Sequence, residues 1–412
     1  MEELLLNVNT KLNIYEILSY FSIELICIIG IILNVIISFF IVRKRKLKRL
    51  SDILTCSVFC LNSIILTLFL FQNESFTIRN DLIVFNSNTI FLKLFINLFA
   101  LFFVYATYKF TRKSHFRVPA VNSILILIIM TAGLIALSDN FTLVYVLLEF
   151  IIILIYKYSS EMRIRKNSLY SPEFIAISFC ATFLFVMFYV MDFLVEDLLQ
   201  KSIMQSCMAL SLLLKIGLFP VFNYSIDKKC RSNIPYSILL FCLLPFVGAL
   251  AFNKIMALCM FNEVCQISSS VFIILCALLA SITLFKTKNL GGYLINLGQV
   301  YTSFYILNSM FTKDLNPQFI IGAITLLLIL FAMIRIYKNN TKNKVIFSIL
   351  LITAASYIPI LGHNMLINIY TYDKTGFFAM NVFIFCNILI IIKTLKLLEG
   401  FYRTSKTSEI CL

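Results

Sequence analysis

The 412-residue chain is poor in charged residues, histidine and glycine, and it has no tryptophan. Asp, Glu, Lys and Arg make up 13% of it, whereas 60% of the residues are hydrophobic and the mean hydropathy is +0.94. A soluble domain cannot bury so large a share of apolar residues around one core. The composition therefore excludes a soluble globular protein and predicts an all-α, polytopic transmembrane protein.

Scarce residue types also exclude several kinds of site. His115 and His363 are the two histidines of the chain, and they are expected on opposite sides of the membrane, which argues against a bis-histidine haem. The 12 cysteines form no CxxC pair, so most are interpreted as small buried hydrophobes and not as metal or iron-sulfur ligands. Motifs that hold nucleotide phosphates are absent from this sequence, which has 11 glycines. We therefore expect no cofactor and no metal ion on this chain.

The sequence is instead rich in long apolar stretches. About thirteen of them are long enough to cross a membrane as helices, because roughly 20 residues span the hydrocarbon layer. They are predicted at 16–42, 52–72, 87–109, 119–138, 141–157, 173–195, 203–225, 235–257, 267–285, 291–311, 317–337, 343–367 and 376–398. Basic loops alternate with connections poor in Lys and Arg, so the positive-inside rule places the N-terminus outside and the C-terminal tail inside. We attribute the net charge of +15 to this topology and to anionic lipids, not to nucleic acid.

Two ionisable residues, Glu149 and Lys215, lie inside predicted spans with apolar neighbours on both sides. A charge in the bilayer core is costly, so such residues usually face a protein interior and pair with an opposite charge. Pro220 follows Lys215 by five residues and is expected to interrupt the helix, as helices that line a polar cavity often do. These residues predict a proton-handling pair. The alternative is a static ion pair that fixes helix packing.

Two further lysines lie within predicted spans. Lys93 has no evident partner in the sequence, and its interpretation is divided between snorkelling to the interface and contact with a neighbouring subunit. Lys393 lies near the inner end of the last span, where snorkelling is the favoured interpretation.

Two ungapped runs show a more specific pattern. The run DNFTLVYVLLEFIIILIY (139–156) joins an Asp/Asn pair to a membrane glutamate and a downstream Tyr, and the run LKIGLFPVFNYSID (214–227) contains Lys215, Pro220 and Asp227. They resemble the fifth and seventh helices of the antiporter-like membrane subunits of respiratory NADH:quinone oxidoreductase (complex I), and most closely subunit 2. In the resemblance, Glu149 falls on the carboxylate that modulates the lysine, and Lys215 on the central proton-loading group.

Other matches to this family are weaker. The run TKNLGGYLINLGQVYTSF (287–304) is similar to the family's Q-T-x-[IL]-K-R-L-L-x-Y-S-S-I-S-H-[IVL]-G-Y, with Tyr301 in place of the His. Where the family's twelfth helix is interrupted and charged, the chain keeps Pro359 but has His363 as its nearest titratable residue. Where the family usually has another lysine in the eighth helix, often after a Pro, it has Pro245 followed by Phe246. The resemblance thus implies an intact half-channel through Glu149 and Lys215 and a degraded exit half.

The resemblance also implies a domain organisation. Residues 1–110 would form about three N-terminal transmembrane helices, 111–258 and 259–400 two inverted five-helix repeats with interrupted helices, and 401–412 a polar tail. The partners would be other membrane-arm subunits of complex I, which would carry NADH, FMN, iron-sulfur clusters and quinone, and membrane lipids, with cardiolipin as one candidate.

The chain would accordingly be a subunit of an H⁺-translocating NADH:ubiquinone reductase with no redox chemistry of its own. The lack of Trp beside abundant Phe, Ile, Leu, Asn and Lys suggests an AT-rich, organellar coding genome and hence the mitochondrial inner membrane. Two alternatives stay open: a free-standing cation/proton antiporter of the same fold, and a structural subunit with a degraded proton channel.

Overall fold

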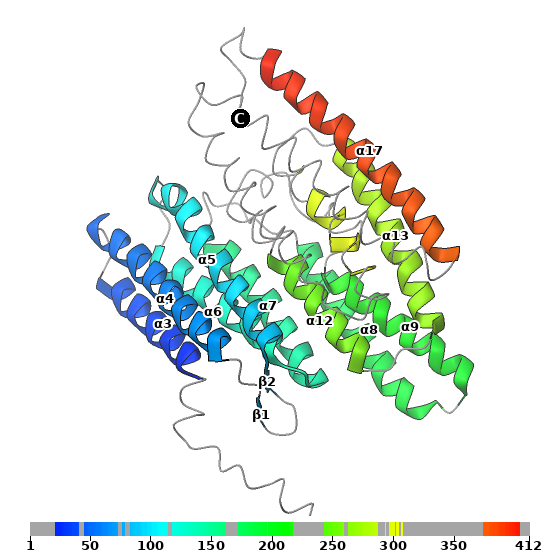
Figure 1. Cartoon of the computed structure of the whole chain (residues 1–412), viewed down its shortest axis with the longest axis horizontal. Helices are drawn as coiled ribbons and strands as arrows, with labels where there is room; N and C mark the ends of the chain where they lie inside the picture. Colours follow the sequence, from blue (N-terminus) through cyan, green and yellow to red (C-terminus); the bar gives the residue numbers. More distant parts are fainter. Residues whose placement is uncertain are drawn as a thin grey trace, which may run out of the picture.

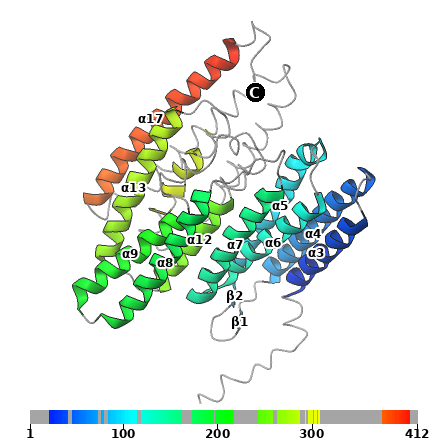
Figure 2. The same ribbon diagram turned by 180° about the vertical axis from the view of Figure 1, so that it is seen from behind.

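The structure is a computed structural model. It describes residues 21–40, 45–72, 76–78, 83–113, 118–161, 172–195, 197–216, 243–258, 263–286, 293, 296–300, 302–304, 306–307 and 374–403. Within these residues the long helices are α3 (Ser22–Phe40), α4 (Arg45–Gln72), α5 (Ser87–Lys113), α6 (Val118–Leu137), α7 (Phe141–Glu161), α8 (Pro172–Leu194), α9 (Leu198–Ile216), α12 (Leu244–Leu258), α13 (Glu263–Lys286) and α17 (Lys374–Arg403). Figures 1 and 2 show them from opposite sides, with α3 and α4 at one end of the molecule and α13 and α17 at the other.

The predicted class, an all-α polytopic membrane protein, is confirmed. In the part of the chain that the structure describes, seven helices are long and apolar enough to span a membrane. They lie at Ser22–Phe40, Arg49–Gln72, Ser87–Tyr105, Val118–Leu137, Phe141–Tyr158, Ala176–Leu194 and Val264–Lys286. The total of thirteen spans stays a prediction, because 317–337 and 343–367 lie outside the described residues. The domain boundaries stay predictions as well.

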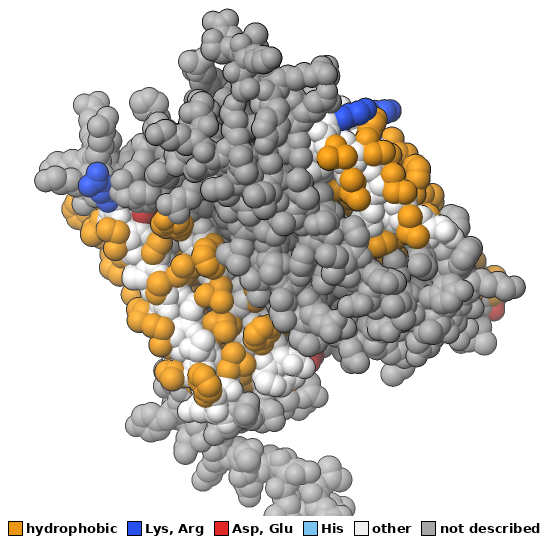
Figure 3. Space-filling view, turned by 45° about the horizontal axis from the view of Figure 1, so that its top comes forward, with side chains coloured by type: hydrophobic (Ala, Val, Ile, Leu, Met, Phe, Trp, Pro, Cys, Tyr) orange, Lys and Arg blue, Asp and Glu red, His pale blue; other side chains and the backbone are white. Residues whose placement is uncertain are grey.

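The outward surfaces of the helices are apolar, as expected for contact with lipid. Large hydrophobic side chains are exposed along α3, α4 and α8, for example Phe39, Phe71 and Phe183. In Figure 3, hydrophobic side chains cover both described surfaces that face the viewer, and Lys and Arg lie at their upper ends. This distribution matches an apolar band with basic residues along one of its edges.

A small β-hairpin, which the all-α prediction does not include, connects α4 to α5. Strand β1 (Phe76–Ile78) pairs with β2 (Ile83–Phe85) in antiparallel register, with Phe76 opposite Phe85. Ile83 also forms a bridge with Ser138 at the end of α6. The hairpin therefore links the α4–α5 connection to the α6–α7 connection, on one side of the helices (Figure 1). Its residues are aromatic or β-branched, which favours a strand once a neighbouring backbone supplies partners.

Polar side chains link the N-terminal helices inside the apolar surroundings. Ser51 Oγ on α4 donates to Asn34 Oδ1 on α3 at 2.6 Å, and Asn34 Nδ2 lies 3.3 Å from Thr55 Oγ1. Asn122 Nδ2 on α6 donates to Ser51 Oγ at 2.9 Å. Such hydrogen bonds join membrane helices because lipid offers these groups no other partner. They fix how α3, α4 and α6 are rotated relative to one another.

Close packing also brings α12 against α9. A Cβ built on Gly248 of α12 would lie 2.6 Å from Cγ2 of Ile216, the last residue of α9. Glycine is required here for the close approach of the two helices. Because Ile216 directly follows Lys215, this contact helps to fix the end of α9 that carries the lysine.

Candidate functional site

The start of α7 is set by a side-chain cap. Asn140 Oδ1 accepts a hydrogen bond from the backbone N–H of Leu143 at 3.1 Å, and α7 begins at Phe141. Asn is a favoured N-cap because its oxygen satisfies an amide that the helix leaves unpaired. Tyr145 and Glu149 follow at a spacing of four residues and therefore share one face of α7.

That face meets α8 and α9. The ammonium group of Lys215 on α9 forms an ion pair with Oε1 of Glu149. It also donates to Oγ1 of Thr182 on α8 at 2.6 Å, and Thr182 Oγ1 lies 2.8 Å from Glu149 Oε1. The Lys215 side chain is 1% exposed, whereas that of Glu149 is 26% exposed. The predicted partners are thus brought together, with the lysine in the interior and the carboxylate nearer the surface.

The Tyr145 ring completes the surroundings of the lysine. The Lys215 Nζ lies 5.0 Å from the ring centroid and 3.4 Å from the Tyr145 hydroxyl oxygen. A cation over an aromatic face is stabilised by the ring quadrupole, and more so where water is excluded. Tyr145 in turn stacks on Phe185 of α8 with ring centroids 4.3 Å apart. This stack holds α7 and α8 at the spacing that the site requires.

The arrangement can hold and pass a proton. A hydroxyl can accept one hydrogen bond while it donates another. Thr182 accepts from the Lys215 ammonium, and its one hydroxyl hydrogen can be donated to the Glu149 carboxylate or to the Ser178 carbonyl oxygen, 2.9 Å away. In the first case it offers an indirect route between the acid and the base beside their direct contact. Thr182 is not evident from the sequence, since threonines are common in membrane helices and its role depends on the rotation of α8.

Comparison with known proteins identifies the fold of this chain through structural similarity and not through sequence similarity. No family model and no curated protein matches the sequence. Among solved structures, a chain of "Respiratory complex I from Thermus thermophilus with bound NADH" is 11% identical, with a TM-score of 0.62 and coverage of 91% of this chain and 88% of that one. A chain of the Thermus thermophilus complex with bound aureothin is 9% identical, with a TM-score of 0.62 and coverage of 92% and 96%. The protein has the fold of a complex I chain.

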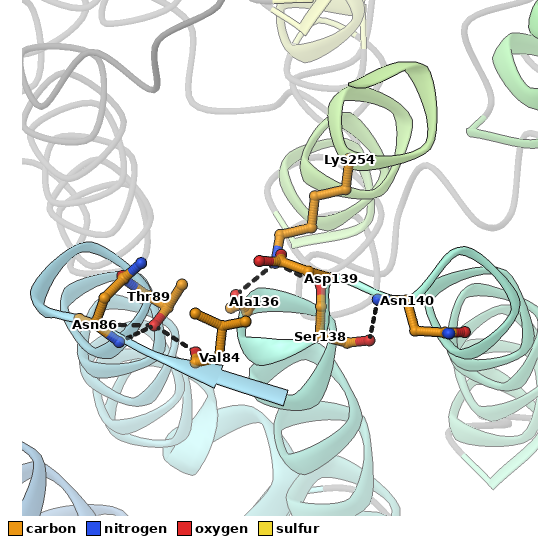
Figure 4. Close-up of polar contacts among 8 residues, drawn as sticks. All are labelled: Val84, Asn86, Thr89, Ala136, Ser138, Asp139, Asn140 and Lys254. Atoms are coloured by element: carbon orange, nitrogen blue, oxygen red, sulfur yellow. Dashed lines mark hydrogen bonds and ion pairs between the residues drawn. The ribbon is translucent and has the colours of Figure 1, made fainter. Parts of the chain in front are cut away.

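The sequence interpretation overlooks one lysine, Lys254 of α12, whose ammonium group lies against the end of α6. This group donates to Asp139 Oδ1 at 2.8 Å, to the Ala136 carbonyl oxygen at 2.8 Å and to the Ser138 carbonyl oxygen at 2.6 Å (Figure 4). All three hydrogens of the ammonium group therefore have acceptors. The contact ties α12 to the junction of α6 and α7 and closes the C-terminus of α6. A charge inside the apolar run FVGALAFNKIMAL (246–258) is the signal that could have indicated it.

Lys93 has a partner within the chain, contrary to the sequence interpretation. It forms a buried ion pair with Glu24 of α3, 69 residues away. Neither snorkelling nor contact with a neighbouring subunit is needed to explain it. Lys393, in contrast, is partly buried and donates to the carbonyl oxygen of Phe285 at 3.0 Å, in the last turn of α13. It thereby ties α17 to the end of α13.

The other predicted site residues lie outside the described part of the chain: Pro220, Asp227, Tyr301, Pro359 and His363. The helix interruption after Lys215 and the exit half of the channel stay predictions. Among the described residues, no group of three or more His, Cys, Asp or Glu side chains could hold a metal ion.

Proposed function

We propose that this chain is a membrane-arm subunit of a proton-translocating NADH:quinone oxidoreductase, in the position of subunit 2. The observation that carries the proposal is the Glu149–Lys215 pair, bridged by Thr182 between three membrane helices. The fold supports it, since the match to a complex I chain extends over 91% of this chain. An ionisable pair at this depth is by default a functional group of a membrane protein.

In the proposed mechanism Lys215 is the group that takes up and releases the proton. While Glu149 is ionised, its carboxylate stabilises the ammonium form of Lys215. In the transfer step the Lys215 ammonium gives one proton to the Glu149 carboxylate, directly or through the Thr182 hydroxyl, so that Lys215 becomes the neutral amine and Glu149 the neutral acid. Release of the Glu149 proton to water and uptake of another proton by Lys215 restore the ion pair. The redox reaction that drives this exchange, with NADH, FMN, iron-sulfur clusters and quinone, belongs to partner subunits.

The proposal extends to location and partners. We place the chain in the mitochondrial inner membrane, in contact with other membrane-arm subunits and with anionic lipid such as cardiolipin. The basic loops and the absence of tryptophan support this placement.

The first test is co-migration. Membranes are extracted with mild detergent and resolved on a native gel, and bands are tested for NADH dehydrogenase activity and for this polypeptide by mass spectrometry. Presence of the chain in the active band supports the proposal. A small complex without that activity contradicts it and favours a free-standing cation/proton antiporter, for which cation-dependent proton exchange would then be measured in liposomes.

The second test separates pumping from a structural role in the same complex. Lys215→Met is expected to assemble normally and to lower the number of protons moved per electron. Normal assembly with unchanged pumping would instead favour a structural subunit whose channel is degraded.

A further inference from the structure

Three lysines gather at one end of the contact between α13 and α17, two helices that lie side by side in Figures 1 and 2. Lys393 of α17 donates to the Phe285 carbonyl oxygen at 3.0 Å, and Lys396 Nζ lies 4.6 Å from the centroid of the Phe285 ring. Lys286 follows Phe285 directly at the end of α13 and is exposed. We call these three residues the lysine cluster.

Carboxylates do not balance the charge of the lysine cluster. Lys396 follows Lys393 by three residues on α17, and the two ammonium groups repel each other. Among the described residues, none of the three lysines forms an ion pair, whereas Lys157 at the end of α7 pairs with Glu161 at 3.4 Å. In the sequence, Glu399 is the one carboxylate within ten residues of the cluster. The cluster therefore has an excess of positive charge that suits an anionic ligand.

An exposed apolar stripe leads to the cluster along each helix. The stripes consist of Leu275, Leu279 and Ile282 on α13, and of Phe385, Ile388 and Ile392 on α17. Residues three and four apart share one helix face, and each stripe ends four residues later on an exposed lysine, Lys286 or Lys396. From its first apolar residue to its lysine, each stripe is about 16 Å long at the rise of an α-helix. This length matches one leaflet, which is about half of the ~30 Å hydrocarbon layer.

Both stripes face the same side of the helix pair. The other flank of α17 is covered, since the Phe383 ring meets that of Phe304 at 4.5 Å and the Thr394 hydroxyl lies 3.0 Å from that of Tyr293. At about 100° per residue, the α17 stripe lies across the α13 contact from these residues. The helices run in the same direction (Figure 1), so the α13 stripe turns to that same open side. In Figure 3, Lys and Arg lie at the upper end of the apolar surface at the upper right, where Figure 1 places α17.

We propose that the lysine cluster and the two stripes bind one anionic phospholipid of the inner leaflet. Lys286 and Lys396 donate to the phosphate oxygens, and the acyl chains lie along the stripes. In the predicted topology α13 and α17 are the ninth and thirteenth spans, whose ends lie on the basic, inner side of the membrane. The site thus gives a position to the anionic lipid of the function proposed above, and it rests on that part of the proposal.

The absence of tryptophan from the chain allows a direct test. Ile282→Trp places a single indole in the α13 stripe, one turn before Lys286. The full chain is reconstituted in vesicles of phosphatidylcholine and phosphatidylglycerol in varied ratio, and one of the two lipids carries brominated acyl chains that quench the indole. The quenching should show a preference for the anionic lipid of roughly fivefold for each of Lys286 and Lys396, the factor that corresponds to about 1 kcal/mol per lysine.

Two variants in the same background assign the preference to the cluster. Lys286→Gln/Lys396→Gln removes two exposed charges and should remove most of the preference. Lys157→Gln, the matched control, removes a lysine from the same side of the membrane and should leave the preference unchanged.

Equal quenching by both lipids before the lysines are replaced would overturn the proposal and leave ordinary lipid contact. An unchanged preference in the double variant would overturn it as well. If Ile282→Trp does not fold, Ile392→Trp moves the indole to the α17 stripe, with the same expected results. The measurement needs no NADH, so its failure is distinct from a failure of the chain to co-migrate with NADH dehydrogenase activity.

Discussion

Replacing Thr182 by valine is expected to slow proton exchange between Glu149 and Lys215 while leaving the helices in place. Valine has nearly the shape of threonine but lacks the hydroxyl that lies 2.6 Å from Lys215 Nζ and 2.8 Å from Glu149 Oε1. Both charges and their direct contact are retained. The variant therefore tests the hydroxyl alone.

The size of the effect follows from the two hydrogen bonds that are lost. Side-chain hydrogen bonds between membrane helices contribute about 0.6 kcal/mol on average and at most about 1.7 kcal/mol. Two such bonds, both to charged groups, place the loss at roughly 1–3 kcal/mol. The barrier rises only by what the hydroxyl contributes to the proton in transit, so this loss is an upper limit. Because ~1.4 kcal/mol corresponds to a tenfold change in rate, proton transfer through the site should slow by up to roughly 100-fold.

The assay follows proton uptake into inverted membrane vesicles with a pH-sensitive dye, at matched rates of NADH oxidation. Thr182→Ser keeps the hydroxyl and is the control, expected to pump as wild type does. Pumping by the valine variant at the wild-type rate would refute the role of the hydroxyl. Equal loss in both variants would instead indicate a packing defect at α8.

Four further substitutions have defined outcomes. Lys215→Met should lower the proton-to-electron ratio with the complex still assembled on native gels, and it should do so more severely than the loss of the Thr182 hydroxyl. Lys254→Met removes three hydrogen bonds at a partly solvated position and should cost about 1–3 kcal/mol, seen as a lower Tm in detergent with little change in pumping. Gly248→Ala forces a methyl group against Ile216 and should cost about 1–3 kcal/mol through overpacking. Gly133→Ala, which meets only a flexible lysine stem, should lower the Tm less.

Helix positions follow closely from the sequence. The span predicted at 119–138 is observed as Val118–Leu137, and that at 173–195 as Pro172–Leu194. The reason is that the thickness of the hydrocarbon layer sets the length of each apolar run, so no tertiary contact is needed to define it. The β-hairpin between α4 and α5 was not predicted, because strands of three residues depend on the partner strand that pairs with them.

The main pair of the candidate site could also be predicted. A lysine and a glutamate inside the fifth and seventh apolar spans have few opposite charges available, so Glu149 and Lys215 are each other's natural partners. Lys93 shows the limit of this reasoning. Its partner Glu24 lies in the first turn of α3, where a charge is easily interpreted as a solvated helix end, and the two meet only through the packing of α3 against α5 and α6.

The sequence by itself therefore determined that the chain spans a membrane with helices, where several of the described helices begin and end, and that Glu149 and Lys215 are expected to pair with each other. Only the tertiary structure decided that Thr182 bridges them, that Lys254 closes the end of α6, and that Glu24 lies against Lys93. The position of a membrane helix depends on the hydropathy summed over neighbouring residues, and the sequence contains all of that information. A contact between two helices depends instead on their rotation and separation, which are set by the packing of every helix around them.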